Sequence, residues 1–325
     1  MIYLSICIPT YNRSKYLSDT IDSIICQPEF IETEEVEIVI CDNCSTDNTE
    51  IIIQGFVDRF PSKIKYYKNE RNIFDRNFEK VLSLGSGVML KLNNDTLVLK
   101  PGALAHLLET VKYCIGKNYV PFLLEGKTDF TQAVVCENAA DFISTTSYFC
   151  TWIGGFFIFN QSFSKMNSFS KESASQLTQV DVLMRLLKSG SKFLVIPNTF
   201  STSVYPKNKG GYNLLNIFIT NYFKILNNYL TNEDEIKVLK KEKEDTLFKF
   251  ILPWIVNVRI DAIKKIFNYT FDISNYRKII KEEFSFFIYL CFETRLFFYL
   301  VAKIIIPKTL IVKIKMFLNK EKHLG

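Results

Sequence analysis

The sequence has little of what several large protein classes require. The chain has eight scattered cysteines and only two histidines. Cys41 and Cys44 form the one close pair, and no second CxxC pair is present to complete a zinc site with them. No basic stretch precedes the first apolar segment and no small-residue cleavage pattern follows it, which argues against a secretory signal. No Arg-rich helix or aromatic RNA-binding motif accompanies the formal charge of +6. We therefore expect a cytoplasmic protein with free, mostly buried thiols and no nucleic-acid partner.

The most apolar stretch, residues 284–325, also lacks the uninterrupted run that a membrane-spanning helix needs. Such a helix takes about 20 consecutive apolar residues, whereas Glu293, Arg295 and Lys303 interrupt this stretch. Its aromatic and aliphatic residues alternate with lysines, a composition typical of an element that lies in the membrane interface. We expect peripheral membrane association on the inner face of the cell membrane. The alternative is that these residues pack on the rest of the chain or on another subunit, so an oligomer stays open.

What the sequence does contain is a pattern of parallel strands joined by crossover helices. The chain has 325 residues, of which 48% are hydrophobic, so it can bury a sizeable core. Short apolar runs alternate with stretches of helical spacing in the first third, as in α/β proteins. Strands are expected at residues 3–9, 36–42, 63–67 and 88–92, then near 119–124, 132–136, 155–159 and 192–197. Helices are expected at residues 14–26, 46–58, about 73–82 and 176–188, and from residue 214 onward the pattern is helical.

Polar residues follow three of these strands directly. They lie in "PTYN" at 9–12, in "CDNCSTD" at 41–47 and in "NND" at 93–95. In open parallel sheets, ligands bind outside the carboxyl ends of the strands, where backbone groups become free. We therefore expect these three segments to converge on one ligand site.

The same segments resemble a known family. "SICIPTYNRSKYLSDTIDSI", "VEIVICDNCSTDNTE", "RN" at 76–77 followed by "GSGVMLKLNND", and "QVDVLMRLLKSG" are similar in order and spacing to the motifs of family 2 inverting glycosyltransferases of the GT-A fold. The first two are most similar to bacterial abequosyltransferase-like enzymes that build surface polysaccharides. The resemblance covers roughly the first two hundred residues. It implies a Rossmann-like α/β domain at 1–212, with a mostly parallel central sheet flanked by helices. A helical extension at 213–283 and the amphipathic basic and aromatic tail at 284–325 then follow.

Several residues are candidates for binding a nucleotide diphosphate sugar donor. Backbone and aromatic groups after the first strand can frame a nucleobase, and an acid and an amide after the second can hydrogen-bond it or the ribose. The resemblance adds an Arg-Asn pair that lies beside the nucleotide in the family. The alternatives are a turn with a helix cap, and a solvated helix face. The predicted donor-binding residues of these segments are Pro9, Thr10, Tyr11, Asn12, Asp42, Asn43, Arg76 and Asn77.

Asp95 is the predicted metal ligand. A diphosphate in a crevice needs its charge neutralised, and a divalent cation held by one carboxylate, the phosphates and water does this. Asp95 matches the last aspartate of the family's Asp-x-Asp motif, so the resemblance implies Mn²⁺ or Mg²⁺. Asn93 and Asn94 stand at the first and middle positions, and both are predicted donor contacts although they bring no charge. The alternative is an Asn-Asp turn between a strand and a helix.

Asp181 is the predicted catalytic base. Single-displacement inversion needs a group that takes the proton of the attacking hydroxyl, and a carboxylate suffices. Asp181 matches the family's catalytic aspartate, although Val180 stands where the family often has Glu. Arg185 follows four residues later, so a helix-face ion pair is the rival interpretation. The fallback bases are Glu125, Asp129 and Asp141.

Two further segments carry predicted contacts. In "TWIGGFFIF", Trp152 can stack on an acceptor sugar, while Gly154 and Gly155 let it approach the backbone; core packing explains the tryptophan equally well. In "YPKNKGGYN", Lys207 and Lys209 suit a donor-binding loop over the diphosphate, and a solvated turn is the alternative.

Together these features predict a metal-dependent inverting glycosyltransferase. It would move a sugar from a nucleotide diphosphate sugar to a hydroxyl of a lipid-linked glycan. A nucleotidyltransferase of similar fold is one alternative, but "PTYNRS" is not the Gly-rich loop with a basic residue that such an enzyme shows after its first strand. The missing first aspartate leaves a second alternative, a non-catalytic nucleotide-sugar-binding partner in a membrane assembly.

Overall fold

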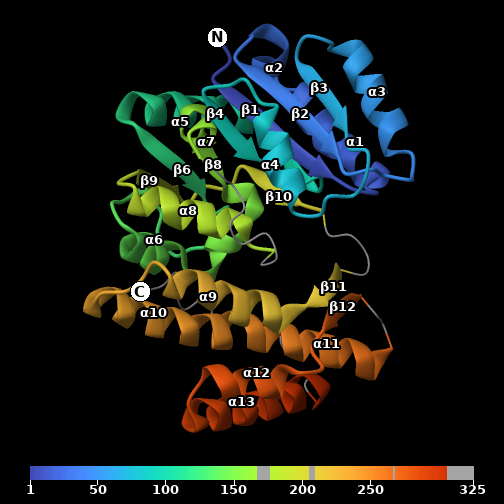
Figure 1. Cartoon of the computed structure of the whole chain (residues 1–325). Coiled ribbons are helices and arrows are strands. Elements are labelled where there is room, and N and C mark those ends of the chain that lie inside the picture. Colours follow the sequence, from blue (N-terminus) through green and yellow to red (C-terminus); the bar gives the residue numbers. More distant parts are fainter. Residues whose placement is uncertain (167–175, 205–208, 266–267, 306–325) are drawn as a thin grey trace, which may run out of the picture. The chain divides into compact units, whose positions relative to one another are not determined.

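The computed structural model describes residues 1–166, 176–204, 209–265 and 268–305 (Figure 1). The chain divides into two compact units, Met1–Pro206 with Asn221–Glu242, and Lys207–Thr220 with Lys243–Gly325. This division differs from the three predicted segments, because residues 221–242 return to the first unit. The Tyr222 hydroxyl lies 3.0 Å from Glu242 Oε1 and 3.2 Å from Cys150 Sγ, all within that unit. The eight cysteines are free thiols, five of them buried.

The first unit is built on a five-stranded sheet in the order β3-β2-β1-β4-β8. Four strands run parallel and β8 runs antiparallel to β4. The bounds are Leu4–Thr10 for β1, Val36–Asp42 for β2, Ile64–Lys68 for β3, Met89–Leu92 for β4 and Phe157–Phe159 for β8. Every residue of β2 and β4 is buried, as expected of parallel strands covered on both faces. The mostly parallel sheet predicted from the apolar runs is therefore present.

Helices cover this sheet on the crossover connections (Figure 1). They are α1 (Ser14–Ile25), α2 (Pro28–Glu32), α3 (Thr49–Arg59), α4 (Arg76–Ser83) and α5 (Ala103–Lys117). Helix α4 packs on β1 and β2, and α1 packs on α3. In α1 the buried residues Leu17, Ile21 and Ile24 recur at helical spacing, which is the periodicity that predicts this helix.

A three-stranded sheet completes the first unit, in the order β6-β9-β7. Its strands are β6 (Tyr119–Leu123), β7 (Val134–Cys136) and β9 (Lys192–Ile196), with α6 (Ala139–Thr146) and α8 (Thr178–Lys188) beside them. Short elements follow: η1 (Ser147–Thr151), η2 (Ile153–Gly155), α7 (Asn160–Ser164), α9 (Tyr222–Asn227) and α10 (Glu233–Asp245). Strand β5 (Leu97–Leu99) pairs antiparallel with β10 (Ser201–Ser203), a ribbon that the sequence does not predict.

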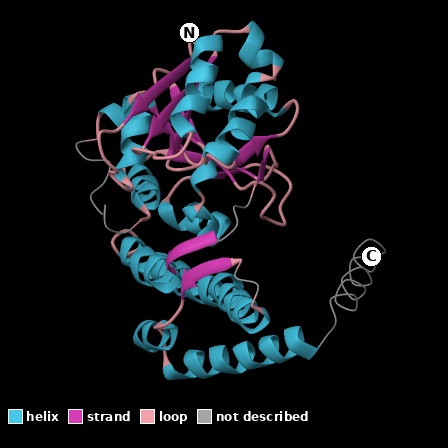
Figure 2. Cartoon of the chain, turned by 90° about the vertical axis from the view of Figure 1, so that its right-hand side faces the viewer, coloured by secondary structure: helices cyan, strands magenta, loops and turns pink. Residues whose placement is uncertain are grey.

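The second unit combines helices with a parallel strand pair (Figure 2). The elements are β11 (Lys209–Asn213), η3 (Asn216–Asn221), η4 (Thr246–Ile251), α11 (Leu252–Lys264), β12 (Tyr269–Asp272), α12 (Tyr276–Glu283) and α13 (Phe286–Ile305). The prediction that residues after 214 are entirely helical is wrong at β12. The Trp254 ring packs edge-on against the Tyr269 and Phe271 rings, with centroids 5.4 and 5.1 Å apart, so aromatic packing stabilises this strand.

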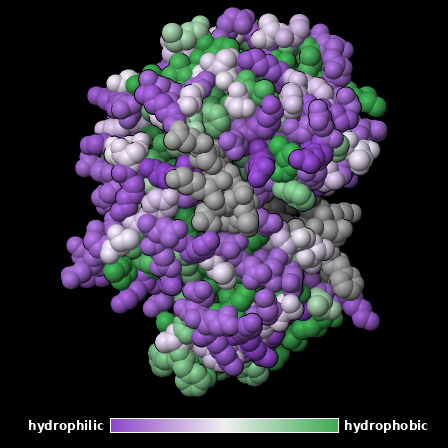
Figure 3. All heavy atoms as spheres, in the orientation of Figure 1, coloured by the Kyte–Doolittle hydropathy of each residue, from purple (hydrophilic) through white to green (hydrophobic). Residues whose placement is uncertain are grey.

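Helix α13 carries an unusual number of exposed apolar side chains. Phe286 and Phe287 are 73% and 74% exposed, and Phe297 and Phe298 are each 62% exposed. Figure 3 shows apolar side chains at the surface where α12 and α13 lie. Among the helices that the structure describes, none is both long and apolar enough to cross a membrane.

Candidate active site

A cavity of about 640 Å³ lies where the first, second and fourth strands of the large sheet end. It is lined by Pro9, Thr10, Tyr11, Arg13, Asn43, Asn72, Phe74, Asp75, Asn77, Phe78, Asn94, Asp95, Ile153 and Gln176. The three polar segments predicted to converge therefore do meet. Of the predicted site residues, Pro9, Thr10, Tyr11, Asn43, Asn77, Asn94 and Asp95 line this cavity.

A network of asparagine side chains builds one wall. Asn43 Oδ1 accepts from the Ile73 backbone N–H at 2.8 Å, and Asn43 Nδ2 donates to Asn72 Oδ1 at 2.8 Å. Asn69 Nδ2 donates to both Asn43 Oδ1 (3.1 Å) and Asn77 Oδ1 (2.9 Å). These bonds hold the segment before α4 against the end of β2. Asn69 and Asn72 were missed from the sequence, because "KNERN" carries no signal beyond a polar loop.

Asp42 lies beneath this wall and does not line the cavity. Its side chain is buried, Oδ1 accepts from the Ser45 backbone N–H at 2.9 Å, and Oδ2 accepts from the Tyr66 hydroxyl at 3.3 Å. This is the geometry of the turn named as the alternative. Donor binding by Asp42 stays a prediction.

The turn from β1 into α1 places one cation on the cavity. Asn12 adopts a left-handed backbone (φ 52°), and its Oδ1 accepts from the Thr46 backbone N–H at 2.8 Å, so Asn12 fixes the turn. Arg13 follows and lines the cavity. Within the described residues its guanidinium forms no hydrogen bond or ion pair. The sequence analysis missed Arg13, although it directly follows the "PTYN" segment.

Asp95 has the features of a cation ligand. Burial raises the pKa of its carboxyl to about 6, while Arg13 and a hydrogen bond from the Thr10 hydroxyl to Oδ2 (3.0 Å) oppose that rise. The Thr20 hydroxyl holds the Asp95 backbone oxygen at 2.9 Å. The effect of burial outweighs that of Arg13, the Thr10 hydroxyl and the Asp95 backbone N–H, which all stabilise the charged form, so the carboxylate suits a further cation such as Mn²⁺ or Mg²⁺. No cluster of three or more His, Cys, Asp or Glu occurs in the described part of the chain, so a cation here depends on phosphates and water for its other ligands.

The other two residues of "NND" differ from each other. Asn94 lines the cavity beside Asp95. Asn93 is only 1% exposed and does not line it. Donor binding by Asn93 stays a prediction that the burial of this side chain does not favour.

Asp181 is engaged away from the cavity. It lies in the first turn of α8, buried, with Oδ2 3.0 Å from Arg185 Nε and Oδ1 accepting from the Tyr229 hydroxyl at 2.7 Å. This is the ion pair named as the rival interpretation. The carboxylates that do line the cavity are those of Asp75 and Asp95, and burial raises the pKa of Asp75.

The fallback bases also lie outside the cavity lining. Glu125 accepts from the Phe200 and Ser201 backbone N–H groups at 2.9 and 3.0 Å. Asp141 accepts from Asn138 Nδ2 at the start of α6, at 2.8 Å. Both therefore have structural partners, and Asp129 does not reach the cavity either.

The predicted acceptor segment reaches the cavity through Ile153 alone. A Cβ on Gly154 would lie 2.7 Å from Trp152 Nε1, and one on Gly155 would lie 2.4 Å from the Leu123 backbone oxygen. The Trp152 ring stacks under Lys127 Nζ, 3.6 Å from the centroid. Close packing thus accounts for both glycines, and acceptor binding here stays a prediction.

The remaining predicted basic residues lie elsewhere. Arg76 lines a separate cavity of about 430 Å³ with Lys80 and Phe163. Lys207 is outside the described residues. Lys209 begins β11 in the second unit.

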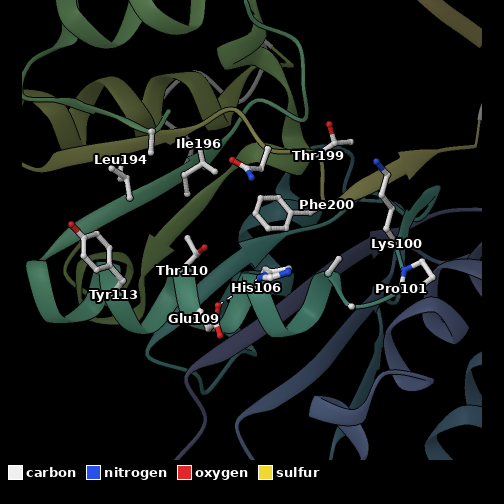
Figure 4. Close-up of a pocket in the computed structure, with 14 residues that line it drawn as sticks. Lys100, Pro101, His106, Glu109, Thr110, Tyr113, Leu194, Ile196, Thr199 and Phe200 are labelled. Carbon is white, nitrogen blue, oxygen red and sulfur yellow. Dashed lines mark ion pairs between the residues drawn. The ribbon is translucent and has the colours of Figure 1, made fainter. Parts of the chain in front are cut away.

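A further cavity of about 610 Å³ has no predicted residue in its lining. Figure 4 shows Leu194 and Ile196 of β9 opposite Thr110 and Tyr113 of α5. His106 and Glu109 of α5 form an ion pair at its edge, with Nδ1 3.6 Å from Oε2.

Comparison with known proteins agrees with this geometry. Residues 5–114, which contain all the residues of the cavity lining except Ile153 and Gln176, match the sequence model of Glycosyl transferase family 2. The resemblance to family 2 is confirmed. We call residues 5–114 the family 2 segment. The chain is also 42% identical over 85 residues to the abequosyltransferase RfbV of Salmonella typhimurium, covering 26% of this chain and 25% of that protein.

Another relative is the poly(ribitol-phosphate) beta-N-acetylglucosaminyltransferase TarS of Staphylococcus aureus. It is 36% identical over 64 residues, which is 20% of this chain and 11% of TarS. The matches thus span a quarter or less of the lengths of both curated relatives.

Solved structures share the fold over a longer range. The crystal structure of TarS has a TM-score of 0.57 at 14% identity, covering 76% of this chain and 44% of that chain. The mannosyltransferase PcManGT from Pyrobaculum calidifontis, in complex with GDP-Man and Mn²⁺, has a TM-score of 0.54 at 14% identity, covering 92% and 85%. The predicted GT-A fold, with a helical carboxyl-terminal extension, is confirmed.

Proposed function

We propose that this protein is an inverting glycosyltransferase that moves a sugar from a nucleotide diphosphate sugar to a hydroxyl of a lipid-linked glycan in surface polysaccharide synthesis. The observation that carries the proposal is the cavity at the carboxyl ends of β1, β2 and β4, which joins Arg13 and Asp95 within the family 2 segment. The similarity to RfbV and TarS, both named as sugar transferases, supports it.

The cavity offers a site for each part of the donor. Tyr11, 43% exposed, presents a ring on which a nucleobase can stack, and Asn94 offers amide groups for hydrogen bonds. Arg13 supplies positive charge for the diphosphate. Asp95 would hold Mn²⁺ or Mg²⁺, and the bound cation would neutralise charge on the departing diphosphate.

Two carboxylates, those of Asp181 and Asp75, are candidates for the catalytic base. Asp181 is the residue that the family motif implies, but it must release Arg185 and Tyr229 before it can accept a proton. Asp75 already lines the cavity, has no hydrogen bond to its carboxylate among the described residues, and has a pKa that burial raises.

Helix α13 would bring the enzyme to its acceptor at the inner face of the cell membrane. At 3.6 residues per turn, the exposed Phe286, Leu290, Phe297 and Ile304 fall within about 40° of one another around the helix. The buried Phe292 and Leu296 point to a different side, and α13 packs on α11. One face is thus covered by protein and another is apolar and exposed, which suits an interfacial helix. Lys303 donates to Asn257 Oδ1, and the lysines after residue 305 lie outside the described residues.

A second candidate function is nucleotide-sugar binding without catalysis. The ion pair that occupies Asp181 favours it, because a binding partner needs no base.

Turnover of labelled donors separates the two candidates. UDP-, GDP-, CDP- and dTDP-sugars are incubated with the protein and Mn²⁺, with and without a lipid-linked glycan extract. The proposal predicts that one donor releases its nucleoside diphosphate, faster with the extract, and that EDTA stops the release. Donor binding without release supports the second candidate, and failure to bind any donor contradicts both.

A further inference from the structure

Lys91 is a buried cation that the proposed chemistry does not use. It lies in β4 with 1% of its surface exposed. Its ammonium donates to the Leu92 backbone oxygen at 3.1 Å, to Asn93 Oδ1 at 3.0 Å and to the Gly154 backbone oxygen at 3.0 Å. The centroid of the Phe157 ring lies 5.6 Å away, on the strand paired with β4. Three acceptors match the three N–H groups of a charged lysine, so this ammonium is fully satisfied.

The contact with Lys91 fixes the side chain of Asn93. An ammonium only donates, so the Asn93 atom that faces it must be the oxygen. The amide nitrogen then points the other way, where it donates to the Asn94 backbone oxygen at 3.0 Å and the Leu97 backbone oxygen at 3.4 Å. Both ends of the amide are therefore occupied within the protein.

The same ammonium joins two segments of the cavity wall. Residues 93–95 contribute Asn94 and Asp95 to the lining, and the Ile153–Gly155 turn contributes Ile153. These segments are far apart in sequence, and Lys91 bonds to both. We propose that Lys91 is a positioning residue that locks the loop carrying Asp95 to this turn and withholds residue 93 from any bound metal or nucleotide.

The proposal explains why an aspartate in place of Asn93, at the start of "NND", would not add a metal ligand. A carboxylate at residue 93 would meet the Lys91 ammonium at about the distance of the present hydrogen bond, and would form a buried ion pair. Burial lowers the pKa of Lys91 to about 8, and the charge of Glu125 opposes that fall, so the ammonium is mostly protonated at pH 7. An acid at this position would therefore compensate Lys91 instead of adding a metal ligand. The part that concerns metal rests on the proposed function; the contact itself does not.

A double-mutant cycle tests the inference with Lys91→Met, Asn93→Asp and the double variant beside the wild type. Methionine keeps the length of the side chain and removes its charge. The first readout is the Tm without metal, and the second is Mn²⁺ binding, followed by the EPR signal of free Mn²⁺. The full chain at pH 7 is used throughout.

With Lys91 present, Asn93→Asp should change the Tm by less than about 3 °C, because the ion pair with Lys91 offsets the hydrogen bonds that the amide nitrogen donates to the Asn94 and Leu97 backbone oxygens. It should also leave Mn²⁺ affinity within about threefold. In the Lys91→Met background the same substitution should lower the Tm, because it buries an uncompensated carboxylate, and should tighten Mn²⁺ about tenfold or more. A merely structural lysine would not reverse the effect of residue 93 on Mn²⁺.

The inference is overturned if Asn93→Asp tightens Mn²⁺ tenfold with Lys91 in place, or if it lowers the Tm as much with Lys91 in place as in the Lys91→Met background. If Lys91→Met does not fold, the Tm and Mn²⁺ affinity of Asn93→Asp alone still decide the matter. Mn²⁺ that binds none of the proteins would contradict the metal site of the proposed function, while the Tm values would still test the Lys91 contact.

Discussion

Among individual residues, Asp95 has the clearest dependence on pH. Its folded pKa of about 6 lies above its ordinary value near 4, so between these values the folded state binds more protons than the unfolded state. The stability that Asp95 contributes is thus fully present below pH 4 and is lost as the pH rises through 6. Asp95→Asn should be more stable than the wild type at pH 7.5 by about 1–3 kcal/mol and should lose this advantage at pH 4.5. Urea unfolding at the two pH values measures the difference.

The exposed Asp19, on the same helix as Thr20, provides the matched control, and Asp19→Asn should show no such difference between the two pH values. Equal stability of Asp95→Asn and the wild type at pH 7.5 would mean that burial does not destabilise the charged Asp95 carboxylate. The same protonation predicts that Mn²⁺-dependent nucleotide binding weakens as the pH falls below 6, because a protonated carboxyl does not hold the cation.

Replacing Asp75 and Asp181 tests which of the two residues is the catalytic base. Whichever residue is the base, its replacement by asparagine should keep donor affinity and lower turnover by about two to four orders of magnitude. Asp181→Asn should also lower stability by about 3–5 kcal/mol, because it removes the carboxylate charge from a buried ion pair with Arg185. Turnover and Tm are measured for both variants. Normal turnover in both would assign the proton transfer to neither residue.

Secondary-structure elements differ in how well the sequence predicts them. The strands of the large sheet are predictable, because β2 and β4 are mostly apolar, as expected of strands buried on both faces. The convergence of polar residues at the strand ends follows from the topology alone. The sequence does not reveal which of these polar groups already form hydrogen bonds with another part of the protein. Asp42 Oδ1 accepts from the Ser45 backbone N–H, and Asn93 Oδ1 accepts from the Lys91 ammonium.

The sequence fails to predict short elements for a different reason. The ribbon of β5 and β10 has three residues in each strand, too few to show a period. Strand β12 lies between two helices and is stabilised by the contact between the Trp254 and Phe271 rings, which no local sequence pattern predicts. Arg13 is the residue that could have been found, because a cation directly after the first strand suits a diphosphate ligand.

The exposed face of α13 makes a prediction about a whole element. Phe286→Asp with Phe297→Asp should abolish co-sedimentation with anionic liposomes, because the charges lie in the face proposed to enter the interface. Ile51→Asp on α3, where the side chain is 73% exposed, is the control and should bind liposomes as the wild type does. Unchanged co-sedimentation of the double variant, or none by the wild type, would mean that this face meets protein and not lipid.

For the whole molecule, the account depends on one unit that contains the family 2 segment and the complete cavity. Residues of the cavity come from β1, the loops after β1, β2 and β4, α4 and the segment before it, the turn at Ile153, and Gln176, all within Met1–Pro206. The nucleotide binding that we propose therefore belongs to the first unit. The second unit carries α13 and the proposed contact with the membrane.

The central claim is that this cavity binds a nucleoside diphosphate through a divalent cation on Asp95. The most direct measurement is calorimetric titration of UDP, GDP, CDP and dTDP into the wild type and Asp95→Ala, each with Mn²⁺ and with EDTA. The account predicts that at least one nucleotide binds the wild type with Mn²⁺, and that EDTA or Asp95→Ala weakens this binding about tenfold or more. Equal binding by Asp95→Ala in Mn²⁺, or no binding of any nucleotide by the wild type, would contradict it.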